Sequence, residues 1–196
     1  MSLAKRPRVR TEPLTAGIEP SPVFTPTNGR DHKQAVVFGK GDQVVHPYHG
    51  AAVIEDLVEL DVFGNARIYL KLSLPHGLTL LVPVDSADQV GLREVASKEE
   101  VSKVFDLLRA AQGGISSIWS RRYKANLAKL VSGDIYQVSE VVRDLSLSLG
   151  EKGLSTADTR MLAKAREILL SELTLAFDST AEHAEAMLDD ILDECR

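Results

Sequence analysis

The feature that most constrains the fold is a change in the period of the apolar residues near residue 97. Before this point, short runs of β-branched and aromatic residues are separated by turn residues, a pattern typical of a small, strongly bent sheet. Beyond it, apolar residues recur at helical spacing, and the segments begin with helix-capping residues. The sequence therefore predicts an α+β chain, with a β-rich domain over residues 35–96 and a helical domain over residues 97–196.

The β-rich domain contains three strand candidates joined by turn sequences. The candidates are Ala51–Leu60, Arg67–Leu74 and Leu78–Val84. Residues 61–65 separate the first two and residues 75–77 separate the last two, and both segments are rich in residues that turns favour. A short meander of this kind predicts a compact Tudor- or SH3-like β-barrel.

The helical domain is expected to contain five helices joined by short loops. Their predicted ranges are 97–111, 119–131, 134–149, 155–177 and 179–195. Three of them begin with the spacing of a capping box, in which two side chains satisfy backbone N–H groups at the helix start. The pairs are Ser97 with Glu100, Ser155 with Asp158 and Ser179 with Glu182.

Residues 1–34 lack a hydrophobic period and hold five of the eight prolines. Such a segment cannot offset the entropy of ordering, so we expect a disordered, basic, proline-rich tail.

No apolar run of the sequence approaches the roughly 18 residues of a membrane span. Cys195 is the only cysteine, so no intramolecular disulfide can form. We expect a cytoplasmic monomer without a membrane partner.

The sequence contains no assembled catalytic or metal-binding motif. Gly39-Lys40-Gly41 lacks the spacing of a phosphate-binding loop, and a turn explains its glycines. His46 and His49 have no further ligand at metal-binding spacing nearby, so we interpret them as turn-packing residues. The acidic residues between 189 and 194 form the solvated face of an amphipathic helix. We therefore expect neither an enzyme, such as a nuclease, nor a cofactor or metal.

A local basic segment contrasts with the net charge of −5 of the whole chain. From residue 107 to residue 133 there is no acidic side chain, and the basic ones are Arg109, Arg121, Arg122, Lys124 and Lys129.

On a helical projection, Tyr123, Leu127, Leu130 and Val131 share an apolar stripe. Arg121 and Lys124 point away from this stripe, and Arg122, Asn126 and Lys129 lie on its flank. Two cationic edges therefore border an apolar seam.

Trp119 begins this predicted helix, and its position permits two interpretations. The projection places it on the apolar stripe, which favours a core tryptophan. Its position after the flexible segment 112–117 favours an exposed side chain. Free N–H groups at a helix start can bind phosphates, and flanking arginines can hold the DNA backbone while an apolar wedge unstacks a base step. The residues alone leave both interpretations open.

Four ordered motifs give the chain a specific resemblance over residues 36–196. They are Phe38–Ala52, Trp119–Leu127, Val142–Leu145 and Met161–Arg166. Together they resemble the CarD/CdnL family of bacterial RNA polymerase-binding regulators. The resemblance implies that the β-rich, Tudor-like module docks on the polymerase β subunit, as does the related module of transcription-repair coupling factor. It also implies that the helical domain reaches promoter DNA at the upstream edge of the melted region.

The resemblance assigns roles to the basic helix. Trp119 would be a wedge in the minor groove, and Arg121, Arg122 and Lys124 would contact the DNA backbone. Lys129 joins them from the helix geometry alone. The implied function is to stabilise the open promoter complex with little sequence specificity, because minor-groove readout is degenerate.

The strands that would meet the polymerase depart from the family pattern. Relatives place arginines on these strands, whereas this chain has Leu60 and Leu81 there, with Arg67 and Lys71 as its charged candidates. We therefore expect docking by apolar contact and strand-edge pairing more than by ion pairs. The alternative is a nucleoid-type DNA-binding protein without polymerase contact. The eight acidic and four basic side chains of residues 35–96 disfavour it.

Overall fold

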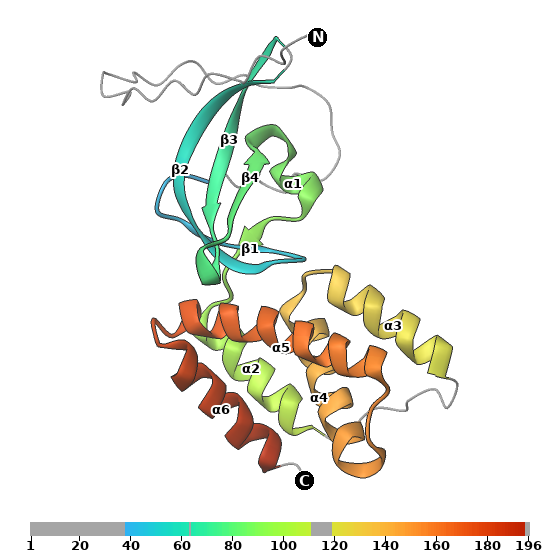
Figure 1. The fold of residues 1–196 in the computed structure, drawn as a ribbon. Helices are drawn as coiled ribbons and strands as arrows, with labels where there is room; N and C mark the ends of the chain where they lie inside the picture. Colours follow the sequence, from blue (N-terminus) through green and yellow to red (C-terminus); the bar gives the residue numbers. More distant parts are fainter. Residues whose placement is uncertain (1–37, 63, 111–118, 195–196) are drawn as a thin grey trace, which may run out of the picture.

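The computed structural model describes residues 38–62, 64–110 and 119–194. An antiparallel five-stranded sheet is followed by a helical part, so the chain has the predicted α+β class (Figure 1). The strands are β1 Gln43–His46, β2 Gly50–Val62, β3 Asn65–Ser73, β4 Thr79–Pro83 and β5 Arg93–Glu94. The predicted tail, residues 1–34, and Cys195 lie outside the described residues.

The sheet is open, with the strand order β4-β3-β2-β1-β5. The expected closed Tudor- or SH3-like barrel is not confirmed, because no pairing joins β4 to β5 within the ranges that the structure describes. A physical reason is that β5 consists of Arg93 and Glu94 alone, which is a short edge from which to close a barrel. β2 and β3 instead form a long hairpin that extends away from the helices (Figure 1).

One face of the sheet carries a hydrophobic core. Its buried side chains include Phe38, Ile54, Leu70, Leu72, Val82 and Leu92. Each fully buried aliphatic side chain of this kind stabilises the fold by about 1.5–3 kcal/mol relative to an exposed one. Successive side chains of a strand point to opposite faces, so Tyr69 and Lys71, on either side of Leu70, lie on the other face of the sheet.

Six α-helices occur within the described residues, where the sequence predicts five. They are α1 Ala87–Val90, α2 Lys98–Arg109, α3 Trp119–Val131, α4 Ile135–Lys152, α5 Thr156–Ala176 and α6 Ala181–Asp193. The additional one, α1, is a single turn between β4 and β5 that ends at Gly91 with φ +83°. A helix of four residues is too short to show a hydrophobic period, so the sequence pattern does not reveal it.

The helix starts agree with the predicted caps, with one exception. Ser97 caps α2 in a reciprocal capping box, and Ser155 caps α5. The prediction for the last helix is wrong by one residue, because Thr180, not Ser179, accepts the backbone N–H of His183. Either hydroxyl can serve as a cap, so the spacing rule alone does not distinguish two adjacent ones.

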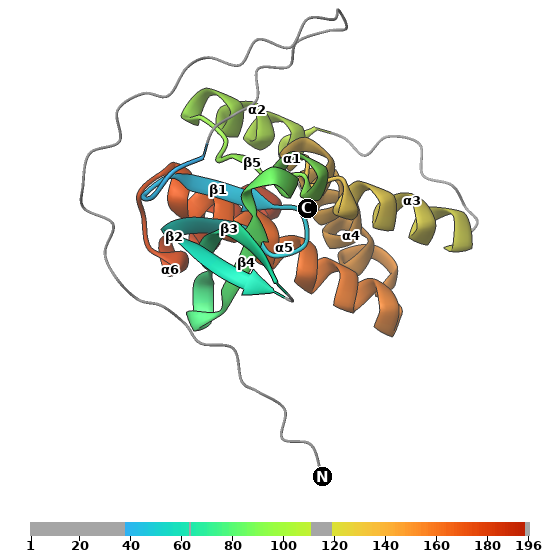
Figure 2. The same cartoon turned by 90° about the horizontal axis from the view of Figure 1, so that it is seen from above.

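The helical part packs around a second core. α4 and α5 pack together, with α3 on one side and with α2 and α6 on the other (Figures 1 and 2). The fully buried side chains include Val101, Leu108, Val141, Leu145, Leu169, Leu173 and Leu188. Leu130 of α3 also joins this core. No helix in the described ranges is long and apolar enough to cross a membrane.

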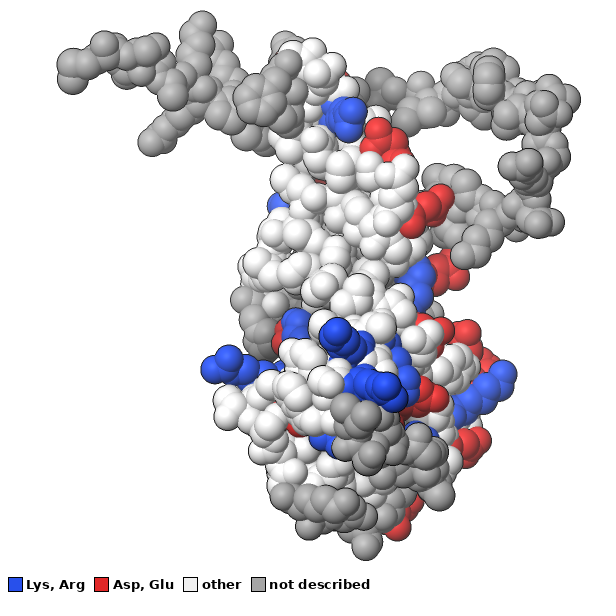
Figure 3. Space-filling model, turned by 90° about the vertical axis from the view of Figure 1, so that its right-hand side faces the viewer, with Lys and Arg blue, Asp and Glu red and all other residues white. Residues whose placement is uncertain are grey.

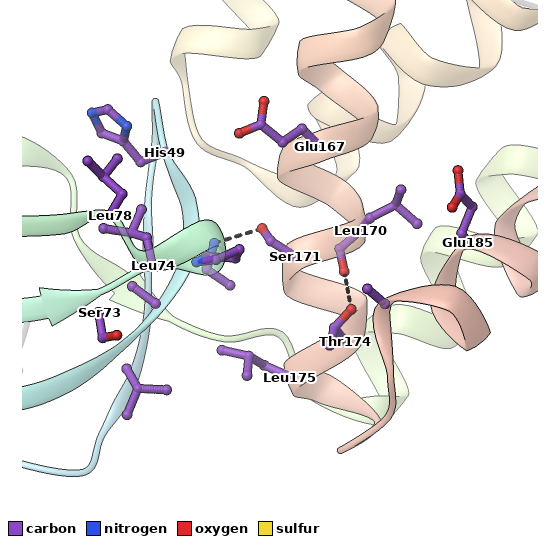
Figure 4. A pocket seen from close by; sticks show the side chains of 15 residues that line it. His49, Ser73, Leu74, Leu78, Glu167, Leu170, Ser171, Thr174, Leu175 and Glu185 are labelled. Carbon is purple, nitrogen blue, oxygen red and sulfur yellow. Dashed lines mark hydrogen bonds between the residues drawn. The ribbon is translucent and has the colours of Figure 1, made fainter.

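The β1–β2 hairpin joins the two parts by resting on α5. The backbone N–H of Ala51 donates to Ser171 Oγ at 2.9 Å (Figure 4). Gly50, at φ +81°, approaches so closely that a Cβ at this position would lie 2.3 Å from the same oxygen. Pro47 of the hairpin packs against Gly133 in the α3–α4 turn, where a Cβ would lie 3.0 Å from the proline ring. A mainly apolar pocket of about 550 Å³ lies beside this junction, between β2–β3 and α5–α6 (Figure 4).

Candidate functional site

α3 packs in an orientation that differs from the predicted one. Its buried side chains are Asn126 and Leu130, whereas Leu127 and Val131 are 41% and 39% exposed. The predicted flank of the helix therefore turns inward, and part of the predicted apolar stripe faces solvent. A physical reason is the carboxylate of Asp158 on α5, which is buried and requires polar and cationic neighbours.

The indole of Trp119 is held at the protein surface. It is 46% exposed and stacks on Tyr123, with the ring centroids 5.3 Å apart. Its Nε1 donates a hydrogen bond to Oδ2 of Asp158 at 3.0 Å. The ring is thus attached to α5 through its N–H, while nearly half of its surface faces solvent.

Asp158 is the centre of this arrangement. It is 2% exposed, and besides Trp119 its Oδ2 accepts the hydroxyl of Ser155 at 2.8 Å and lies 3.7 Å from Nη2 of Arg122. Its position in the first turn of α5 favours a carboxylate, because the N-terminus of a helix carries a partial positive charge. The sequence identifies Asp158 only as a capping residue, since its contacts with α3 depend on the tertiary fold.

Several polar atoms of this cluster are left without a partner. Arg122 Nε, Asn126 Nδ2 and Asp158 Oδ1 are buried, and no atom of the described chain hydrogen-bonds to them. An unpaired buried polar group costs about 1–3 kcal/mol, so stability alone does not favour such a cluster. Buried polar groups without a hydrogen-bond partner tend to occur at functional sites, where stability is not the only requirement.

The basic side chains of α3 fall into two groups. Arg121 and Lys124 are exposed to solvent. Arg122 lies beside Asp158, and Nζ of Lys129 lies 2.7 Å from Glu140 Oε2 on α4. On the side of the molecule where α3 lies, Lys and Arg side chains gather over the helical part (Figure 3). Arg121 and Lys124 are therefore the predicted cations that α3 presents most openly to an anionic partner.

The four residues predicted to dock on a protein lie on one face of the sheet. Leu60 of β2 pairs with Arg67 of β3, and Lys71 of β3 pairs with Leu81 of β4. Directly paired residues point to the same side, and Arg67 and Lys71 are four positions apart on one strand. All four therefore share the face opposite the buried core.

We call this surface the outer face. Its central residues are Asp56, Val58, Leu60, Arg67, Tyr69, Lys71, Leu81 and Pro83. Sequence patterns do not single out Asp56, Val58 or Pro83, although alternation from Arg67 points to Tyr69. The face ends at β4, which is an edge strand of the sheet. Such an edge presents backbone groups with which another chain can pair.

The cations of the outer face have carboxylate neighbours within the protein. Lys71 Nζ lies 2.9 Å from Glu55 Oε2, and Arg67 Nη1 lies 4.0 Å from Asp85 Oδ2. Leu81 is 43% exposed on the same face. The outer face is therefore largely apolar, and its positive charges are partly compensated.

His46 and His49 pack together in the β1–β2 turn. Their ring centroids lie 4.8 Å apart, and Nδ1 of His46 accepts the backbone N–H of Tyr48 at 3.1 Å. Burial, with a smaller contribution from the charge of His49, lowers the pKa of His46. Within the residues that the structure describes, no three His, Cys, Asp or Glu side chains form a group that could hold a metal ion.

Comparison with known proteins matches the sheet and the helices to two domain families. The CarD-like/TRCF RID domain family matches residues 38–96, which hold the sheet, and the CarD C-terminal domain family matches residues 103–189 among the helices. "Putative transcription factor YdeB" of Bacillus subtilis (strain 168) is 30% identical over 139 residues, which cover 70% of this chain and 90% of that protein.

These features and matches define a transcription regulator with a sheet module followed by a helical module. The chain belongs to the CarD/CdnL family, as its motifs predict.

Proposed function

We propose that this protein binds the β subunit of RNA polymerase and stabilises the open promoter complex by inserting Trp119 into the minor groove at the upstream edge of the melted DNA. Residues 35–96 form the polymerase-interaction domain, and residues 97–196 form the DNA-binding domain. Family membership supports the proposal, and one observation carries it. A half-exposed indole stands at the first residue of α3, beside the exposed cations Arg121 and Lys124.

The chemistry of α3 suits a distorted minor groove. An apolar ring can wedge between base pairs and offset part of the stacking energy that opening costs, while flanking cations contact phosphates. Arg121 and Lys124 take the phosphate role in this proposal, because Arg122 and Lys129 already have carboxylate neighbours within the protein. Two such contacts give modest affinity, and minor-groove readout gives little sequence preference.

The outer face compensates for this modest affinity. A domain bound to the polymerase keeps α3 near the promoter at an effective concentration that can reach roughly millimolar. The hydrogen bond from Ala51 to Ser171 and the packing of Pro47 on Gly133 join the two parts directly. Docking of the outer face therefore also determines where Trp119 stands relative to the DNA.

Stabilisation of the open complex follows from differential binding. The wedge can insert only when the DNA at the edge of the melted region is already distorted. Binding energy is therefore larger for the open complex than for the closed one, and the equilibrium shifts toward the open complex. The reaction requires no chemical step by the protein.

The test combines a polymerase binding assay with open-complex lifetimes for the full-length chain and Trp119→Ala. We expect the parent to bind the isolated β subunit and to lengthen the lifetime. The variant should bind the subunit equally but shorten the lifetime roughly tenfold, because the wedge offsets an unstacking cost of a few kcal/mol per base step. Failure to bind the β subunit would contradict the proposal and leave DNA binding without polymerase contact.

A control on folding accompanies this test. Because Trp119 is 46% exposed, its removal should cost clearly less than the about 3–5 kcal/mol typical of a deleted core aromatic. Unfolding of Trp119→Ala by denaturant measures this directly. A loss in the core range, or an unchanged open-complex lifetime, would contradict the wedge.

A further inference from the structure

We propose that Asp158 is a positioning residue for Trp119. In this inference its buried carboxylate holds the indole N–H and so fixes, before DNA arrives, which part of the ring faces the duplex. The inference rests on the proposed function, because it describes how the same site is prepared. It assigns Asp158 a role beyond the start of α5.

The hydrogen bond connects a surface ring to a fixed acceptor. Trp119 Nε1 lies 3.0 Å from Asp158 Oδ2, and Asp158 is 2% exposed. The carboxylate itself is anchored, because Ser155 donates its hydroxyl to Oδ2 and accepts the backbone N–H of Asp158. A hydrogen bond to an ionised carboxylate is about twice as strong as one between neutral groups.

Two contacts from different elements define the ring orientation. Tyr123, on the same helix, stacks on one face of the indole with an interplanar angle of 26°. Asp158, on α5, holds the N–H edge. Stacking alone permits the ring to flip by about 180° about the Cβ–Cγ bond, and the hydrogen bond selects the orientation whose N–H edge faces Asp158. A side chain that is ordered before binding loses less rotamer entropy on binding, which strengthens the complex.

The charges around Asp158 make this arrangement compatible with nearby DNA. A bare carboxylate at this position would repel phosphates. Burial, the partial positive charge at the start of α5 and the guanidinium of Arg122 at 3.7 Å all reduce that repulsion. In this inference Arg122 compensates Asp158 and does not grip a phosphate. The indole N–H is already in use, so the ring meets the DNA as an apolar surface.

Intrinsic fluorescence reports how freely the indole moves, because Trp119 is the only tryptophan of the chain. Asp158→Ala removes the acceptor, whereas Asp158→Asn keeps a carbonyl oxygen at the same place. Thr180→Ala is the matched control, because it removes a helix cap on α6 without touching the indole. We expect the fluorescence anisotropy of the free protein to fall in Asp158→Ala, and to stay near the parent value in Asp158→Asn and Thr180→Ala.

Open-complex lifetimes then connect the orientation to function. We expect Asp158→Ala to shorten the lifetime about tenfold, the effect that loss of a hydrogen bond to a charged group can produce. Phenylalanine has no N–H to hold. In a Trp119→Phe background, the additional Asp158→Ala change should therefore shorten the lifetime no further, which is the coupling expected of two residues acting as a unit.

The positioning role would be overturned by an unchanged anisotropy in Asp158→Ala. It would also be overturned by an equal further shortening of the lifetime in the Trp119→Phe background, or by an equal shortening in Thr180→Ala. A normal lifetime in Asp158→Ala, together with a shortened one in Trp119→Ala, would overturn the positioning role alone. A normal lifetime in Trp119→Ala would overturn the proposed function, and the inference that depends on it.

Discussion

Arg93 and Glu172 form a bidentate ion pair across the junction between the sheet and the helices. Nη1 lies 2.6 Å from Oε1, and Nη2 lies 2.8 Å from Oε2. Glu172 is 1% exposed and also accepts the backbone N–H of Ala96 at 2.9 Å. Nε of Arg93 donates to the carbonyl of Gly133 at 2.8 Å. One arginine therefore links β5 both to α5 and to the α3–α4 turn.

Arg93→Ala should destabilise the protein strongly, because it leaves the Glu172 carboxylate buried without its cation. Removal of one partner of a fully buried pair typically costs about 3–5 kcal/mol. Because the Arg93 side chain is 31% exposed, we expect a loss toward the lower end of this range. Lys164→Ala is the control, since its pair with Glu167 is exposed and such pairs contribute about 0–1 kcal/mol. Denaturant unfolding of both variants measures the difference. Equal losses would mean that the junction pair contributes no more than a surface pair.

Gly50→Ala should disturb the same junction by a different route. At φ +81° a non-glycine residue costs about 1–2 kcal/mol, and the new Cβ would also meet Ser171 Oγ and, at 3.3 Å, the backbone Cα of Ile168. Gly64→Ala is the control, because it has φ +83° but nothing within 4 Å of a Cβ. We expect faster hydrogen exchange at the Ala51 amide only in Gly50→Ala. Identical exchange in both variants would show that the close approach of Gly50 to α5 is not needed to protect the Ala51 amide.

Most of the secondary structure could be predicted because long elements carry a clear period. The hairpin of β2 and β3 and the helices α2, α3, α4 and α5 lie close to their predicted ranges. β1, with four residues, and β5, with two, were not predicted individually, and neither was the single turn α1. Closure of the sheet was not predictable from alternation, because it depends on whether strands distant in sequence can meet.

The candidate site was predictable where it depends on one element or on regular pairing. Leu60, Arg67, Lys71 and Leu81 share a face because of strand alternation and register. The orientation of α3 was not predictable in this way. It depends on a contact between Trp119 and Asp158, which lie 39 residues apart. A capping motif identifies Asp158 but does not show what its carboxylate contacts.

Leu81→Asp and Leu60→Asp should weaken binding to the polymerase β subunit. A carboxylate placed in an apolar contact loses hydration without gaining a partner, so we expect affinity to fall at least roughly tenfold. Ile68→Asp is the matched control, because Ile68 is an exposed residue of β3 on the opposite face of the sheet. DNA affinity should stay unchanged in all three variants. A loss in Ile68→Asp as large as in Leu81→Asp would mean that the outer face is not the docking surface.

His46 should make the stability depend on pH below its usual pKa. The pKa of His46 is lowered in the folded state by burial and by His49, so the unfolded chain binds the proton more readily. The contribution of neutral His46 to the free energy of unfolding is therefore complete above the unfolded pKa of about 6.5, and it is lost as pH falls below that value. His46→Asn, which keeps an acceptor near the Nδ1 position, should remove this part of the dependence. Denaturant midpoints between pH 5 and 7.5 test it, and parallel curves for variant and parent would contradict it.

Arg121 and Lys124 should contact phosphates, and Lys129 should contribute less. Removal of one phosphate-binding cation flattens the log–log dependence of DNA affinity on salt by a little under one unit. We expect this change for Arg121→Ala and for Lys124→Ala, at similar size on unrelated fork sequences. Lys129→Ala should give a smaller change, because Nζ lies 2.7 Å from Glu140 Oε2. Lys103→Ala, an exposed cation on α2, is the control that should leave the slope unchanged.

The salt series also separates phosphate binding from base readout. A variant that no longer binds a phosphate binds every fork sequence more weakly and releases fewer counterions, so affinity and slope change together. A side chain that reads a base instead raises the affinity for its own sequence and leaves the slope for other sequences unaltered. If Arg121→Ala and Lys124→Ala kept the parent slope while losing affinity at one sequence only, these side chains would be reading bases. The weak specificity of the proposed mechanism would then be wrong.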